Sequence, residues 1–156
     1  MQKKAISKPQ EKSLKSIESQ IFMKAVKFSD QMLSEMNQLF SIWGMTALQH
    51  NALRVLYENE TEEGLASKEL GKQLYTRVPD VTRLLDRLAD KGWLVRERDP
   101  NNRRVVRARL TAIGEELIAS ITAPLKELEA RQLEQFSLED KRELIRLFEL
   151  KGISIN

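Results

Sequence analysis

The sequence of 156 residues contains no cysteine and a single histidine, His50. The absence of cysteine excludes disulfides, thiolate nucleophiles, cysteine-ligated zinc and thiol redox sensing. One imidazole cannot supply the several nitrogen or sulfur ligands that a zinc site needs. We therefore expect neither a metal nor a cofactor.

Long apolar runs are also missing. No stretch approaches the roughly 20 apolar residues that cross a bilayer, and the N-terminus has lysines without the apolar run and small-residue cleavage site of a signal peptide. There is no glycine-rich phosphate loop, and neighbouring carboxylates such as Glu115 and Glu116 stand in no recognisable catalytic context. These absences make an enzyme the least favoured class and predict a cytoplasmic protein with no membrane partner.

What the chain does have is an uneven distribution of charge. Residues 66–110 carry twelve basic and six acidic side chains, whereas residues 16–65 and 111–150 each have a net charge of −4. A polyanion is therefore attracted to the middle of the chain. A solvated, arginine-rich surface explains the charges equally well, so charge alone does not choose between the two interpretations.

Helical periodicity occupies both ends of the chain. Apolar residues recur at helical spacing over about 14–40, as one long helix or as two joined by a bend. A second long helix is predicted over 112–135, with Thr111 as its N-cap and a bend at Pro124. Ser137 is expected to cap a last helix over 138–150. Because these helices are rich in apolar residues and nothing in the chain obviously covers them, a second subunit is expected to do so.

The middle of the chain has the order helix, helix, turn, helix. Thr46 and Gln49 have the spacing of a capping box, which opens the first of these helices. A short helix over 66–74 leads through a turn to a helix over about 78–91, with a proline in its first turn, where the missing N–H would have had no partner. Gly92 is expected to end this helix in the left-handed conformation.

A β-hairpin follows, because the period changes from helix to strand. Residues 99–102 form a turn cluster, and apolar residues alternate with arginines over 104–110. The fold predicted is mainly α with a small β-hairpin wing (α+β): a winged helix-turn-helix with long N- and C-terminal dimerisation helices. The expected regions are a flexible tail (1–12), an N-terminal dimerisation helix region (13–45), a winged helix-turn-helix DNA-binding domain (46–111) and C-terminal dimerisation helices (112–156).

The sequence from Leu65 to Gly114 resembles the MarR family of transcription regulators. The resemblance rests on an ordered set of residues: Leu65, Lys68-Glu69-Leu70, Leu74, Val81-Thr82-Arg83-Leu84, Asp86-Arg87-Leu88, Lys91-Gly92, Arg96, Asp99-Pro100, Arg103-Arg104 and Leu110-Thr111. It implies a triangular homodimer built from the first and last two helices, with one winged-helix lobe per subunit on a pseudo-palindromic operator of double-stranded DNA. Family analogy favours a repressor whose DNA affinity a small-molecule effector can tune.

The helix over 78–91 is the expected reading helix in the major groove. Position alone assigns four residues to DNA contact: Arg77, Asp80, Thr82 and Arg83. Asp80 accepts from a cytosine amino group or simply favours the helix N-terminus. Arg87, one turn further along, reaches a phosphate or forms an ion pair with Asp86, Asp90 or a neighbouring element.

The wing, about 97–105, is expected at the minor groove with Asn102, Arg103 and Arg104 near its tip. Arg104 matches the family arginine that enters the narrow groove, where the negative potential is concentrated. The family's wing usually has an aspartate where this chain has Asn102. An amide can still hydrogen-bond but supplies no ionic attraction, so the direction of Arg104 is expected to be looser or to be set by Asp99.

Two further interpretations concern other partners. Met36, Phe40, Trp43 and His50 are candidates for binding a small molecule, although ordinary core packing is the favoured interpretation for each of them. The alternative to DNA binding is a winged-helix module that binds another protein. Such a module needs exposed apolar residues over 77–104, where the sequence has mostly arginine, asparagine, threonine and aspartate.

Overall fold

The structure is a computed structural model, and it describes residues 16–153. These residues form two units, 16–34 and 35–153. The tail expected at 1–12 and the first residues of the helix expected from 14 lie outside the described part.

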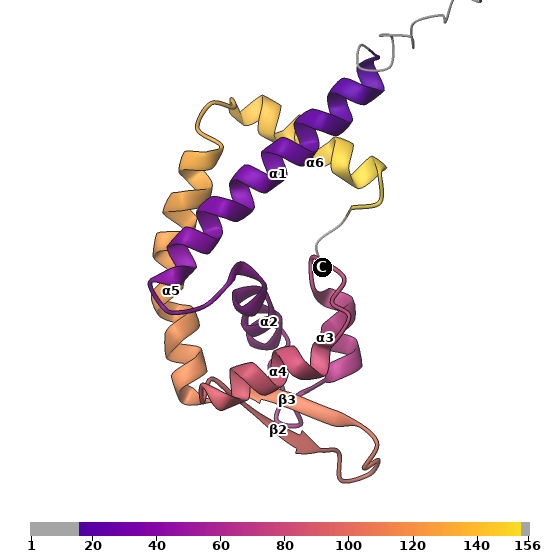
Figure 1. The fold of residues 1–156 in the computed structure, drawn as a ribbon, viewed down its shortest axis with the longest axis vertical. Coiled ribbons are helices and arrows are strands. Elements are labelled where there is room, and N and C mark those ends of the chain that lie inside the picture. The colour runs from indigo at the N-terminus through magenta and orange to yellow at the C-terminus, as the bar shows by residue number, and fades with distance from the viewer. Residues whose placement is uncertain (1–15, 154–156) are drawn as a thin grey trace, which may run out of the picture. The chain divides into compact units, whose positions relative to one another are not determined.

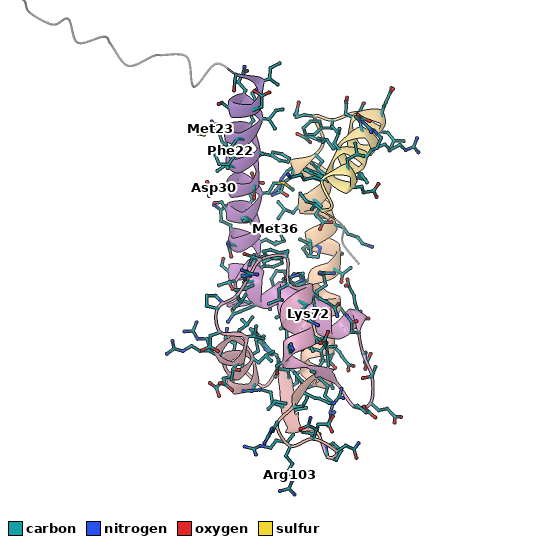
Figure 2. All side chains as sticks on the ribbon, turned by 90° about the vertical axis from the view of Figure 1, so that its right-hand side faces the viewer. Phe22, Met23, Asp30, Met36, Lys72 and Arg103 are labelled. Carbon is teal, nitrogen blue, oxygen red and sulfur yellow. The ribbon has the colours of Figure 1, made fainter. Side chains whose placement is uncertain are left out.

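The first unit is the N-terminal part of helix α1 (Ile17–Ser41). The single continuous helix is one of the two arrangements that the periodicity allowed. Its large apolar side chains are more than half exposed at five positions: Ile17, Ile21, Phe22, Met23 and Val26. Figure 2 shows Phe22 and Met23 on this part of the helix.

The second unit contains the end of α1 and all the other elements. These are α2 (Ala47–Glu58), β1 (Leu65–Ala66), α3 (Ser67–Gln73), α4 (Val81–Asp90), β2 (Leu94–Arg98), β3 (Val106–Leu110), α5 (Ala112–Gln132) and α6 (Leu138–Leu150). Helix α4 packs along β2, and α2 packs against both α5 and β3. Helix α4 and the β2–β3 hairpin therefore lie together at one end of this unit (Figure 1), as a winged helix-turn-helix requires.

The expected helix caps are present. Thr46 and Gln49 form the capping box of α2, and Thr111 accepts from the N–H of the third residue of α5. Ser137 caps α6. Gly92 follows α4 with φ +74°, a left-handed conformation that costs glycine little. These caps depend on residues close in sequence, so the pattern predicts them correctly.

The sheet has three strands rather than the two of the expected hairpin. Strand β3 lies in the middle, with β2 on one side and the short strand β1 on the other, and both pairings are antiparallel. Leu65 pairs with Ala108, and Ala66 pairs with Arg107. A two-residue strand is too short to show alternation, and the prediction that 66 begins a helix was wrong for this reason.

Two helix boundaries also differ from expectation. Asp80 is the N-cap of α4, so Pro79 precedes the helix instead of lying in its first turn. The helix expected at 112–135 ends at Gln132. Pro124 lies inside it, and the expected bend there stays a prediction.

The core of the second unit lies between the end of α1, helices α2, α3, α4 and α5, and the sheet. Its largest fully buried side chains are Phe40, Leu53, Leu70, Leu85, Leu88, Leu94, Ile121 and Val55. Helix α6 contributes no buried residue. Among residues 16–153, no helix combines the length and the apolar character that crossing a membrane requires.

We predict that Gly114→Ala destabilises the fold through a steric clash. A Cβ at Gly114 would lie 2.0 Å from the carbonyl oxygen of Trp93. That oxygen accepts the N–H of Thr111 at 3.1 Å and cannot simply move away. The expected loss is more than about 2 kcal/mol in the free energy of unfolding, measured by urea denaturation.

The matched control is Gly44→Ala. Gly44 has φ +64°, but a Cβ there meets nothing within 4 Å. Only backbone strain is added, so we expect a loss of about 1 kcal/mol. Equal losses in the two variants would contradict the proposed clash.

Candidate nucleic-acid interface

A hydrogen bond to α2 fixes the turn between α3 and α4. The Oδ1 atom of Asn51, which is 3% exposed, accepts the N–H of Tyr75 at 3.1 Å. Leu70 of α3 and Leu74, which directly follows α3, are also buried. Sequence analysis did not identify Asn51, because the contact joins residues 24 positions apart and leaves no local pattern.

Asp80 begins α4. Its Oδ1 atom accepts the N–H of Arg83 at 2.9 Å, which satisfies one of the helix's free N–H groups and places a negative charge at the positive end of the helix. The helix-terminus role is therefore present in the structure, while a base contact by Asp80 stays a prediction.

The outer face of α4 carries the expected polar residues. Thr82, Arg83 and Arg87 are exposed, and Arg77 is exposed in the turn before the helix. The expected alternative for Arg87 was an ion pair with Asp86 or Asp90, but Asp86 instead pairs with Arg96 of β2. Within residues 16–153, no ion pair includes Arg77, Arg83 or Arg87.

A hollow of about 670 Å³ lies between α3 and the beginning of α4. Its basic and hydroxyl side chains come from both helices and the turn between them: Ser67, Lys68, Lys72, Thr76, Arg77 and Thr82. The surface beside the reading helix is thus concave. These side chains can donate hydrogen bonds to phosphate oxygens, and they stand beside the carboxylate of Asp80 and several apolar residues.

The wing loop is a closed turn. Asp99 Oδ1 accepts the N–H groups of Asn101 and Asn102 at 2.8 and 3.0 Å. Asn102 Oδ1 then accepts the N–H of Arg104 at 3.2 Å. Asn102, Arg103 and Arg104 are exposed, and Figure 2 shows Arg103 pointing away from the rest of the molecule.

The expectation that the direction of Arg104 is set by Asp99 stays a prediction. Asp99 forms no ion pair with the side chain of Arg104 among the described residues. Its Oδ2 atom instead accepts from Arg107 Nε at 2.7 Å. This hydrogen bond and the one from the Asn101 N–H lower the pKa of Asp99 below its usual value, so the carboxylate stays charged.

The arginines of the basic segment therefore divide into two groups. Arg96, Arg107 and Arg109 are paired with Asp86, Asp99 and Glu97. Six arginines of the segment form no ion pair with any described residue and are all exposed: Arg77, Arg83, Arg87, Arg98, Arg103 and Arg104. This second group, which we call the free arginines, is available to neutralise phosphates.

Comparison with known proteins identifies the family. A model of the MarR family matches residues 43–105. The uncharacterized HTH-type transcriptional regulator YkoM of Bacillus subtilis is 32% identical over 111 residues, which are 70% of this chain and 70% of YkoM. A MarR transcription factor from Planctomyces limnophilus has a crystal structure with 36% identity and a TM-score of 0.68, covering 86% of this chain and 97% of that one. The chain belongs to the MarR family of transcription regulators.

A further MarR structure shares the fold alone. A mutant of MarR from E. coli in complex with operator DNA has 23% identity and a TM-score of 0.76, and the match covers 83% of this chain and 91% of that one. The mainly helical winged fold predicted from the sequence is confirmed by these MarR structures.

The four candidate ligand residues of this MarR-family chain lie in or against its core. Phe40 is 0% exposed and His50 is 6% exposed, and their rings stack with centroids 4.3 Å apart. Met36 and Trp43 are partly buried against the same core. Burial, and to a smaller extent the charge of Arg54, lowers the pKa of His50 to about 4. His50 is thus a neutral, packed ring at neutral pH, and ligand binding by these residues stays a prediction.

We predict that His50 makes stability depend on pH. Between its ordinary pKa of 6.5 and about 4, the unfolded chain binds a proton at His50 and the folded chain does not. The free energy of unfolding should therefore fall as the pH falls through this window, by about 3 kcal/mol in total.

The variant His50→Phe keeps an aromatic ring but removes the titrating group. Urea denaturation from about pH 7 down to about pH 4 measures both proteins, and carboxylates contribute alike to each. The wild-type curve should fall below the variant's as the solution becomes acidic. Parallel curves would mean that His50 does not carry the effect.

Proposed function

We propose that this protein is a homodimeric, sequence-specific regulator of transcription, most simply a repressor, that binds a pseudo-palindromic operator. Helix α4 would lie in the major groove of double-stranded DNA and the wing at the minor groove. The observation that carries the proposal is the set of free arginines. These six cations are exposed, and they lie on the reading helix, the turn before it and the wing.

The chemistry of α4 suits the major groove. An α-helix fits a groove about 12 Å wide, and an arginine can donate two hydrogen bonds to guanine O6 and N7. Arg83 lies in the first turn of α4, where side chains of a reading helix meet base edges. Arg87 follows one turn later and would reach a phosphate, while Thr82 would contact a base edge or a phosphate.

The wing supplies the second contact. Arg103 and Arg104 lie in the loop between β2 and β3, which is closed by the turn around Asp99. A narrow minor groove has an enhanced negative potential that attracts an inserted arginine. Arg104 would enter that groove, and Arg103 and Asn102 would contact the backbone beside it.

A second copy of the chain would complete the molecule. The four apolar side chains Ile145, Leu147, Phe148 and Leu150 of α6 are 46–73% exposed. Leaving such a patch in water is unfavourable, and a second copy that buries it gives a symmetric dimer. In the same proposal, the second copy also covers the exposed apolar residues of the first unit.

The proposed location and the proposed lack of catalytic activity both follow from DNA as the ligand. A regulator whose relatives are bacterial would act in the cytoplasm, where bacterial DNA lies, and would have no catalytic activity of its own. A small-molecule effector stays an expectation. The protein-binding alternative is not favoured, since Tyr75 is the only large apolar side chain exposed among residues 65–110, all of which are described.

We predict that Arg83→Ala and Arg104→Ala each weaken operator binding about 10- to 100-fold, as expected for the loss of one good base or groove contact. The operator is selected first from a random DNA pool, and affinities are measured by fluorescence anisotropy. The dimer should stay intact, because both side chains are exposed and outside the core.

Lys126→Ala is the charge-matched control. Lys126 is exposed in the second half of α5 and carries the same charge, so its removal should change affinity less than about two-fold. Wild-type affinity should also fall steeply with salt, as log K falls by about 0.9 per phosphate contact for each unit of log salt. Absence of any binding to DNA at low salt would overturn the proposed function.

We predict that Phe148→Glu weakens the dimer. Phe148 is 48% exposed in α6, and a charge there would face the apolar surface of the second copy. The dimer dissociation constant should rise at least about 10-fold, measured by sedimentation equilibrium. Lys68→Gln makes the same change in net charge on the exposed surface of α3, outside the helices expected to form the dimer, and should leave the constant unaltered. An unchanged dimer in Phe148→Glu would place the interface elsewhere.

A further inference from the structure

Arg107 of β3 joins the wing to the loop that precedes β1. Its Nε donates to Asp99 Oδ2 at 2.7 Å, and its Nη1 donates to the carbonyl oxygen of Gly64 at 3.1 Å. Its Nη2 lies 3.8 Å from Glu63 Oε2. The planar guanidinium thus binds the wing with one edge and the body of the domain with another, which a single ammonium group could not do in the same geometry.

The body end of this bridge is fixed. Gly64 is buried with φ +73°, and a Cβ there would lie 2.7 Å from the carbonyl oxygen of Ala108. The next residue, Leu65, pairs with Ala108 in the sheet. Because the loop is held this closely against β3, the carbonyl oxygen that Arg107 contacts has little freedom to move.

The wing end of the bridge controls the turn. The side chain of Asp99 is 10% exposed, and its other oxygen, Oδ1, accepts the N–H groups of Asn101 and Asn102. Asn102 in turn accepts the N–H of Arg104 at its side chain and that of Val105 at its carbonyl oxygen. Hydrogen bonds therefore run without a gap from Gly64 to the backbone of Arg104.

We propose that Arg107 is a positioning residue that holds the wing loop in the direction in which Arg104 meets the minor groove, without contacting DNA itself. This inference rests on the proposed function. Arg107 is set apart from its neighbours because its guanidinium is engaged and its side chain is 28% exposed, whereas Arg103 and Arg104 are exposed and unpaired with any described residue. A wing that supplied only positive charge would not need Arg107 to be engaged with Asp99 and Gly64.

The first test is whether Arg107 acts through Arg104. Operator affinity is measured for Arg107→Met, for Arg104→Ala and for the double variant. We expect Arg107→Met to weaken binding about 10-fold in the wild-type background but less than about two-fold when Arg104 is already alanine, since coupled residues are not additive. Equal factors in both backgrounds would mean that Arg107 contacts DNA directly, and would overturn the inference.

The second test asks whether operator affinity rises or falls when Asp99 loses its negative charge. Asp99→Asn removes a negative charge close to the DNA and releases Arg107. If Arg107 were a direct contact, affinity would rise, because repulsion is lost and a cation is freed. If Asp99 and Arg107 position the wing, affinity should fall about as far as in Arg107→Met. A gain in affinity would therefore contradict the inference.

The third test needs no DNA. Hydrogen exchange at the N–H groups of Asn101 and Asn102 is measured in the free dimer, and it should accelerate at least about five-fold in Arg107→Met as the turn loosens. The matched control is Arg109→Met, two residues along the same strand, whose ion pair with Glu97 at 3.3 Å does not involve the loop. In the control, hydrogen exchange in the loop should be unchanged. The contribution of Arg104 to operator binding should be unchanged as well.

The three tests distinguish failure of the proposed function from failure of the positioning role alone. If the wild-type protein binds no operator, the proposed function fails. If it binds and Arg107→Met changes neither loop exchange nor the contribution of Arg104, only the positioning role fails. Urea denaturation of each variant confirms that it is folded under the binding conditions, and Arg107→Lys, which can reach Asp99 or Gly64 but not both, should recover only part of the affinity.

Discussion

Burial of three leucines on α4 is the constraint that orients the DNA-facing surface. Leu84, Leu85 and Leu88 pack into the core, where α3 and β2 are the neighbouring elements. A helix has 3.6 residues per turn, so fixing these positions inside turns Arg83 and Arg87 outward. The direction of the arginines thus follows from the burial of the leucines, and no attraction between arginine and protein is needed to produce it.

Carboxylates then decide which basic residues remain available. Arg96 and Arg109 are occupied by Asp86 and Glu97, and Arg107 is occupied by Asp99. A guanidinium held in such a pair stiffens the hairpin and its junction with α4, but it has less capacity left for a phosphate. The net charge of the segment counts all of these residues alike. The pairing separates the two kinds, and our proposals give the wing one arginine that shapes the loop and another that meets DNA.

The parts of the fold that were predicted correctly depend on residues close in sequence. The capping box of Thr46, the left-handed Gly92 and the alternation that gives β3 are all local patterns. The exposure of the predicted DNA-contact residues follows from helical periodicity and the hairpin turn. Their contacts with DNA stay predictions.

The features that were missed depend on contacts between distant residues. Asn51 reaches Tyr75 across 24 positions, and Arg107 reaches Gly64 across 43. The pairing of β1 with β3 joins 65 and 66 to residues about 40 positions later, so two residues without alternation gave no signal. Asp99 was recognised as a turn residue, but its partner could not be identified, since four arginines stand within a few positions of it.

Burial along the last two helices shows why the lobe and the dimer depend on different contacts. Gly114, Ile118 and Ile121 of α5 are buried next to the sheet and α2, Leu128 is the last buried residue of α5, and α6 has none. The lobe therefore has a core of its own, whereas α6 has no buried residue and, in our proposal, is covered by a partner chain. Two reading helices must be spaced by about one turn of duplex, roughly 34 Å, to bind adjacent half-sites. Since no contact within one lobe can set that spacing, the helices outside the lobe core have to set it, and the free energies of dimer formation and operator binding become linked.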